Sequence, residues 1–200
     1  SHKYMACFKY LKGKLFIENI SVQNIIKKNR TPFYLYSEQQ IKENYLKFAK
    51  NFRSVRPLIC FAAKANTNLT IMKILGKLGS GADVVSGGEL LKALKAGIKP
   101  NKIVFSGVGK TEEELKLAIE KKILLINVES ESEAILINEI GKKINKVISI
   151  GFRLNPNVDA KTHKKISTGK AENKFGVSIK SFSSFYKKIK KFKKLKIDAI

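Results

Sequence analysis

Short apolar runs and amphipathic stretches alternate along most of the chain. From Leu58 onward, each apolar run is followed by a polar turn and then by apolar residues at helical spacing. Because the runs are apolar throughout, we expect a parallel sheet that is covered on both faces, and therefore an α/β fold. The predicted strands are Leu58–Ala63, Ala82–Val85, Ile103–Phe105, Ile123–Val128, Val147–Leu154 and Ile197–Ile200.

The predicted helices carry recognisable start signals and core faces. Ser37 is expected to cap the first long helix. Three later helices open on the pattern of a capping box, in which Ser or Thr is followed three residues later by Glu. These boxes are Ser86 with Glu89, Thr111 with Glu114, and Ser130 with Glu133. Core positions at helical spacing are Leu69, Met72, Leu75, Leu90, Leu91 and Leu94.

Two architectures fit this pattern, an open doubly wound sheet and a closed (β/α) barrel. No Gly-x-Gly-x-x-Gly follows the first strand, so the barrel is favoured. A complete (β/α)8 barrel needs about 250 residues, whereas this chain has 200. We therefore expect residues 37–200 to form a partial barrel that continues beyond Ile200. Residues 1–36 are expected to be an N-terminal β segment, and the predicted strands before the first long helix are Lys14–Ile17 and Thr31–Ser37.

The formal net charge of +24 raises the possibility of a nucleic-acid partner. Only four of the 40 basic residues are arginine, however, and the lysines are scattered over predicted helix surfaces, which favours a solvated surface without nucleic-acid binding. No apolar run approaches the ~18 residues of a membrane helix, so we expect a cytoplasmic protein with no membrane contact. No metal-ligand cluster is present, and Cys7 and Cys60 are expected to remain unpaired.

Reacting groups in barrels lie at the C-terminal ends of the strands. Lys64 is distinctive there because it directly follows an apolar run, which would desolvate its amine and favour Schiff-base chemistry. Position alone leaves open that Lys64 simply reaches into water. The polar residues expected at the strand ends are Lys64, Asp83, Ser86, Ser106, Asn127, Glu129, Arg153 and Asn155.

The segment Phe61-Ala62-Ala63-Lys64-Ala65-Asn66 resembles the signature of fold-type III pyridoxal-phosphate enzymes, the alanine racemase and ornithine decarboxylase group. Longer segments resemble the diaminopimelate decarboxylases within that group, in unbroken order from about Gly13 to Ile200. These segments are Leu78–Glu89, Val104–Thr111, Ile126–Ser130, Arg153–His163, Ile166–Gly169 and Glu172–Gly176. The resemblance implies an alanine racemase-like barrel preceded by part of a β domain that residues beyond Ile200 complete.

The resemblance also implies a function. Lys64 would carry pyridoxal 5'-phosphate as a Schiff base, and the enzyme would decarboxylate meso-2,6-diaminopimelate to L-lysine and CO2, the last step of lysine biosynthesis. Asp83 and Arg153 are candidates for binding and orienting the cofactor, although either could simply cap a loop in water. His163 lies in a long loop that would act as an active-site lid, although a lone loop histidine is more often only solvated. A homodimer is expected, and no metal.

Several alternatives remain open at this stage. The substrate could be that of another decarboxylase of the group, for arginine, ornithine or carboxynorspermidine. A non-catalytic pyridoxal-phosphate carrier and a nucleic-acid-binding protein are further options. Ser86-Gly87-Gly88-Glu89 could cradle a phosphate at a helix N-terminus, but we interpret it as a tight turn before a capped helix. Because the family's remaining active-site groups are expected beyond Ile200, these 200 residues alone should not be catalytically competent.

Overall fold

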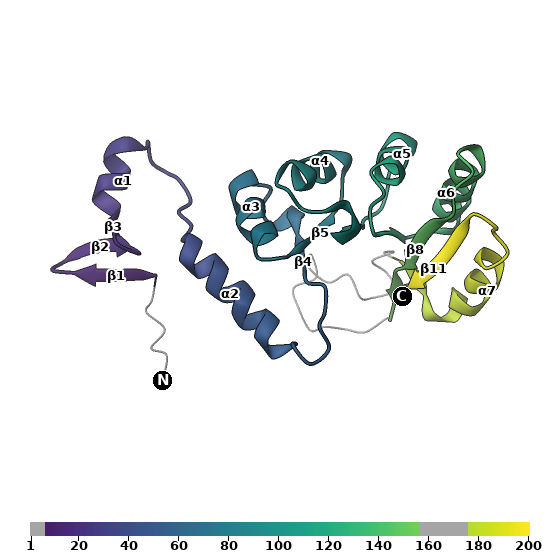
Figure 1. Cartoon of the computed structure of the whole chain (residues 1–200), viewed down its shortest axis with the longest axis horizontal. Coiled ribbons are helices and arrows are strands. Elements are labelled where there is room, and N and C mark those ends of the chain that lie inside the picture. Colours follow the sequence, from purple (N-terminus) through teal and green to yellow (C-terminus); the bar gives the residue numbers. More distant parts are fainter. Residues whose placement is uncertain (1–6, 157–175) are drawn as a thin grey trace.

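The computed structural model describes residues 7–156 and 176–200. A small antiparallel sheet and a long helix precede a six-stranded parallel sheet (Figure 1). The order of strands in the parallel sheet is β11-β8-β7-β6-β5-β4, so successive strand-helix units lie side by side along an open arc. This arrangement confirms the predicted α/β fold and partial barrel.

The N-terminal segment forms a three-stranded antiparallel sheet with one short helix. Lys12 and Gly13 both have positive φ, 47° and 75°, as the tight two-residue turn between β1 and β2 requires. Thr31–Ser37 was predicted to be a strand, and this was wrong: these residues form no strand pairing among the described residues. The elements are β1 (Phe8–Leu11), β2 (Lys14–Ile17), β3 (Ile20–Ser21) and α1 (Val22–Lys28).

The long helix α2 (Glu38–Asn51) begins where the sequence predicted, because the Ser37 hydroxyl accepts a hydrogen bond from Gln40 N at 3.0 Å. The Glu18 carboxylate accepts hydrogen bonds from Gln39 N at 2.9 Å and from the Ser37 hydroxyl at 2.7 Å. These hydrogen bonds lower the pKa of Glu18. One carboxylate thus joins the end of β2 to the first turn of α2.

The parallel sheet contains all six predicted strands, although three of them are shorter than predicted and the last begins two residues earlier. Neighbouring strands pair in parallel throughout. A further short parallel pair, β9 (Leu154–Asn155) with β10 (Val177–Ser178), lies beyond the end of β8. The six strands are β4 (Cys60–Ala62), β5 (Gly81–Val84), β6 (Ile103–Phe105), β7 (Leu125–Val128), β8 (Ile148–Phe152) and β11 (Leu195–Ala199).

Among the described residues, the parallel sheet and the helices that follow its strands share one apolar core. Alternate strand residues such as Val84, Phe105 and Ile150 are fully buried, whereas Asp83 and Asn127 on the other face are only half-buried. Within the described residues only the helix-facing side of the sheet is fully covered, because the arc is open opposite the helices (Figure 1). The helices are α3 (Leu69–Lys77), α4 (Gly87–Lys95), α5 (Glu112–Glu120), α6 (Glu131–Lys143) and α7 (Ile179–Ile189).

The predicted caps and core faces are mostly present. Only Thr111 and Glu114 form a complete capping box. Ser86 and Ser130 do accept hydrogen bonds from the expected N3 amides, but the glutamates of these two boxes bind elsewhere. Met72, Leu75 and Leu90 are buried as predicted, whereas Leu91 is half exposed. None of the helices in residues 7–156 and 176–200 is long and apolar enough to cross a membrane.

Candidate active site at the strand ends

Lys64 lies in a single 3-10 turn, Ala63–Ala65, directly after β4. Ala63 is completely buried, which fixes the start of the turn, but Lys64 itself is exposed. The described residues therefore do not desolvate this amine, and its expected desolvation stays a prediction. An exposed primary amine at the end of a strand remains accessible to an aldehyde.

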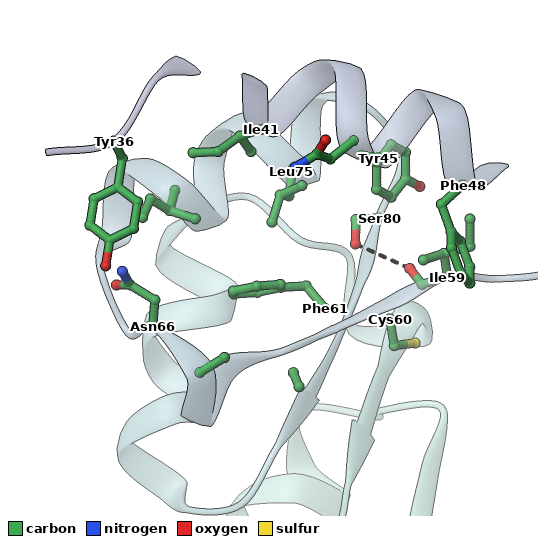
Figure 2. A pocket seen from close by; sticks show the side chains of 14 residues that line it. Tyr36, Ile41, Tyr45, Phe48, Ile59, Cys60, Phe61, Asn66, Leu75 and Ser80 are labelled. Carbon is green, nitrogen blue, oxygen red and sulfur yellow. Dashed lines mark hydrogen bonds between the residues drawn. The ribbon is translucent and has the colours of Figure 1, made fainter. Parts of the chain in front are cut away.

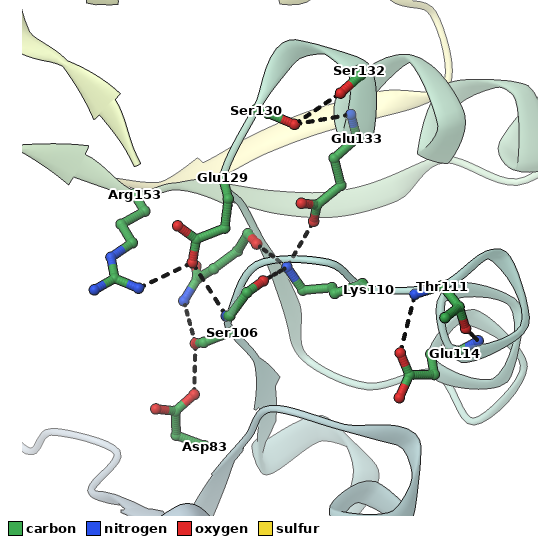
Figure 3. Close-up of polar contacts among 12 residues, drawn as sticks. Asp83, Ser106, Lys110, Thr111, Glu114, Glu129, Ser130, Ser132, Glu133 and Arg153 are labelled. Atoms are coloured by element: carbon green, nitrogen blue, oxygen red, sulfur yellow. Dashed lines mark hydrogen bonds and ion pairs between the residues drawn. The ribbon is translucent and has the colours of Figure 1, made fainter. Parts of the chain in front are cut away.

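Asp83, on the neighbouring strand β5, is held by a line of hydrogen bonds that crosses three strands. Ala62 is the register partner of Asp83, so this carboxylate lies one strand away from the Lys64 turn. The Ser106 hydroxyl, just after β6, donates to Asp83 Oδ1 at 2.6 Å and accepts from Asn127 Nδ2 on β7 at 3.0 Å (Figure 3). We call Asp83, Ser106 and Asn127 the polar row.

Arg153, the third candidate, follows β8 and pairs with Glu129 at the end of β7. Its Nη1 lies 3.1 Å from Glu129 Oε1, which also accepts a hydrogen bond from Gly107 N at 3.2 Å (Figure 3). The Glu129 side chain is only 3% exposed, and among the described residues its Oε2 has no hydrogen-bond partner. A buried carboxylate oxygen without a partner is costly, so Glu129 Oε2 is a candidate acceptor for a bound donor. The structure thus links Arg153 to the polar row through the Ser106-Gly107 segment.

A buried ion pair that sequence reasoning did not single out supports the same edge. Lys110 Nζ lies 2.7 Å from each of three acceptors: the carbonyl oxygens of Gly107 and Asn127, and Glu133 Oε1 (Figure 3). The lysine side chain is 1% exposed, and that of Glu133 is 9% exposed. Burial raises the pKa of the Glu133 carboxyl, and the attraction of Lys110 opposes this rise.

The glycine-rich turn at Ser86 matches our interpretation as a turn before a capped helix. Ser86 Oγ accepts from Glu89 N at 3.2 Å, and Glu89 in turn accepts from Val85 N at 2.8 Å. The amide of Gly87 donates to the Glu114 carboxylate at 2.7 Å, so an anionic group already occupies the N-terminus of α4. Hydrogen bonds from Gly87 and Thr111 amides lower the pKa of Glu114.

A cavity of about 540 Å³ lies away from the strand ends, between α2, β4 and α3 (Figure 2). Its lining is mostly apolar, with residues such as Ile41, Phe48 and Phe61. The Ser80 hydroxyl at its wall lies 3.1 Å from the Ile59 carbonyl oxygen, and burial raises the pKa of the Cys60 thiol. No charged side chain of the described residues lines this cavity, whereas charged groups meet at the strand ends, so we assign the candidate site to the strand ends.

His163 and most of the predicted lid lie outside the described residues, so the structure does not place them. Among the residues that it does place, Glu129 and Lys110 were missed as site residues. Glu129 had been noted only as a strand-end residue. Lys110 is one of many lysines, and its sequence neighbours carry no sign of its burial.

Comparison with known proteins defines the class. The family model "Pyridoxal-dependent decarboxylase, pyridoxal binding domain" matches residues 38–199, and the chain belongs to this family. The expected cofactor, pyridoxal phosphate, is therefore confirmed at the level of the family. The parallel sheet that carries Lys64, Asp83 and Arg153 falls within the matched range.

Within this family, the chain is similar to several diaminopimelate decarboxylases. The chain is 46% identical over 198 residues to the diaminopimelate decarboxylase of Aquifex aeolicus, covering 99% of this chain and 47% of that protein. It is 53% identical over 151 residues to that of Helicobacter pylori strain J99, covering 76% and 37%. The crystal structure of the M. jannaschii diaminopimelate decarboxylase matches with a TM-score of 0.88 and 40% identity, covering 96% and 46%. The chain thus spans about half the length of the relatives it matches.

Proposed function

We propose that this chain is the cofactor-carrying part of an enzyme that decarboxylates meso-2,6-diaminopimelate to L-lysine and CO2. The observation that carries the proposal is the accessible amine of Lys64, which follows buried Ala63 one strand from Asp83, in a chain 46% identical to a diaminopimelate decarboxylase. Two relatives of known structure, from M. jannaschii and Helicobacter pylori, were crystallised with L-lysine, which is the product of this reaction.

The residues present fit pyridoxal phosphate in chemistry. Lys64 offers the amine that would hold the cofactor, Asp83 and Arg153 would orient it, and Glu129 keeps one buried acceptor oxygen for a bound donor. When bound, the cofactor supplies an electron sink for the carbon that loses its carboxylate. The protein's part is to hold Lys64 at the strand end and to fix charged groups beside it.

Other features predicted from the sequence remain part of this proposal. They are the homodimer, the cytoplasmic location, the lid role of His163, and the assignment of residues 1–36 to a β domain distinct from the barrel of residues 37–200. Arginine as substrate has less support, because a viral arginine decarboxylase is only 20% identical, with a TM-score of 0.71, and shows the fold alone. Light scattering of the full-length protein tests the dimer.

The central test is chemical labelling of Lys64. The full-length protein, loaded with pyridoxal phosphate, is reduced with borohydride, digested and mapped by mass spectrometry. We expect the label on Lys64, lysine production from meso-diaminopimelate, and loss of that production in Lys64→Ala, because no other amine would hold the cofactor at this position. Lys73→Ala, on the neighbouring helix α3, is the matched control and should be active.

Two results would contradict the proposal. One is a label on a different lysine, and the other is undiminished turnover in Lys64→Ala. Turnover of arginine or ornithine in place of meso-diaminopimelate would retain the class of enzyme and overturn the substrate. The 200-residue chain alone is expected to release no lysine.

A further inference from the structure

We infer that Ser106 and Asn127 are positioning residues, which hold the Asp83 carboxylate in its working orientation beside the Lys64 turn. This inference rests on the proposed function, since it needs Asp83 to act on a bound cofactor or substrate. It starts from the shortest contact in the polar row, 2.6 Å between Ser106 Oγ and Asp83 Oδ1. A hydroxyl that donates to a carboxylate at this distance forms a strong, charge-assisted hydrogen bond.

The direction of the polar row is fixed by its chemistry. A carboxylate only accepts, so the single Ser106 proton is committed to Asp83, and the Ser106 oxygen must then accept from its other neighbour. Asn127 meets this need with its Nδ2 donor at 3.0 Å. The amide therefore sets the orientation of the hydroxyl, and the hydroxyl sets the orientation of the carboxylate.

The far end of the row is anchored on two sides. The backbone carbonyl oxygen of Asn127 accepts a hydrogen bond from the buried Lys110 ammonium at 2.7 Å, which fixes the backbone of Asn127. On the adjacent strand, Gly151 is the register partner of Asn127, and a Cβ added there would lie 2.5 Å from Asn127 Oδ1. Because Gly151 has no side chain, it leaves room for the carboxamide group of Asn127. Packing of this kind is expected where a side chain must be held in one rotamer.

Asp83 needs such support because its own strand does little to hold it. The residue is half-buried on the open face of the sheet, whereas its neighbours Ala82 and Val84 are fully buried. Without the Ser106 hydroxyl, the carboxylate would be free to sample other rotamers. At metal sites, loss of an outer partner that orients a ligand typically lowers activity about tenfold to a hundredfold, and we expect a loss of similar size here.

The experiment is a double-mutant cycle in the full-length holoenzyme. Ser106→Ala should lower kcat by about tenfold to a hundredfold with little change in KM, because binding groups stay in place. Ser106→Thr keeps the hydroxyl and should restore most of the rate. In an Asp83→Ala background, Ser106→Ala should cause no further loss, since its effect passes through the carboxylate. Ser80→Ala is the control, because it removes a buried hydroxyl from the opposite end of β5.

The outcomes separate the inference from the proposed function. If the wild-type enzyme produces no lysine from meso-diaminopimelate, the proposed function fails, and the same cycle is then measured on the dissociation constant of pyridoxal phosphate by absorbance. Equal losses from Ser106→Ala with and without Asp83 would overturn the inference. So would full activity in Ser106→Ala, or an unchanged rate and cofactor affinity in Asp83→Ala.

Discussion

Two ion pairs at the same edge of the sheet, Lys110 with Glu133 and Arg153 with Glu129, differ in how completely they are satisfied. Lys110 places its ammonium 2.7 Å from each of three acceptors and is 1% exposed. The side chain of Arg153 is 37% exposed, and buried Glu129 has one oxygen with no partner among the described residues. The closed pair serves the fold, whereas in the open pair one oxygen of Glu129 could still accept a hydrogen bond from a ligand.

The largest effect should come from breaking the closed pair. Glu133→Ala leaves the Lys110 ammonium buried without its counter-ion, so we expect the free energy of unfolding to fall by about 3–5 kcal/mol. Urea unfolding of the full-length protein, monitored by circular dichroism, measures this free energy of unfolding. Glu139→Ala removes an exposed partner of Lys142 and is the control, with little expected change. A loss no greater than that of the control would show that the buried pair is not a structural element.

A mutation in the open pair should change ligand affinity more than the free energy of unfolding. Glu129→Gln keeps an oxygen that can accept from Gly107 N and Arg153, but it replaces the charged carboxylate and puts an amide donor at the other position. We expect pyridoxal phosphate or meso-diaminopimelate to bind the full-length enzyme about tenfold or more weakly, as for loss of a hydrogen bond to a charged group. Absorbance titration measures the affinity for pyridoxal phosphate, and KM reports that for meso-diaminopimelate. Unchanged affinity for both would mean that Glu129 Oε2 binds neither the cofactor nor the substrate.

A third carboxylate at this edge, Glu114, should produce the smallest effect. Its pKa is lowered by hydrogen bonds from the Gly87 and Thr111 amides, so its folded pKa lies below the usual 4.5. The stabilisation is then fully present above the unfolded value and is lost as the pH falls through the folded pKa. We expect Glu114→Gln to lower the melting temperature slightly at pH 6 and to match the wild type in strong acid. A constant difference from pH 6 to pH 3 would contradict this assignment.

Much of the fold and part of the candidate site follow from the sequence because they depend on local patterns. Apolar runs separated by capped helices place Asp83, Ser106 and Arg153 at one edge, since parallel strands end together. Thr31–Ser37 has the β-branched and aromatic residues of a strand but no pairing partner among the described residues, and composition alone does not supply one.

The pairing at Lys110 could not be predicted for a different reason. Ser130-x-x-Glu133 has the pattern of a local capping box, yet the Glu133 side chain reaches back to the loop after β6. A local pattern does not reveal that a side chain has a stronger partner on a neighbouring unit. The desolvation of Lys64 is likewise not fixed by the residues that precede it, because it depends on what lies across the open arc.

Gly151 has a consequence for how relatives of this protein can diverge. Any side chain at this position would collide with the carboxamide of Asn127, so the two positions are not independent. A lineage that acquires alanine in place of Gly151 must also acquire a shorter residue in place of Asn127. It thereby loses the donor that orients Ser106. Among diverged sequences, a side chain at position 151 should therefore seldom occur together with asparagine at position 127.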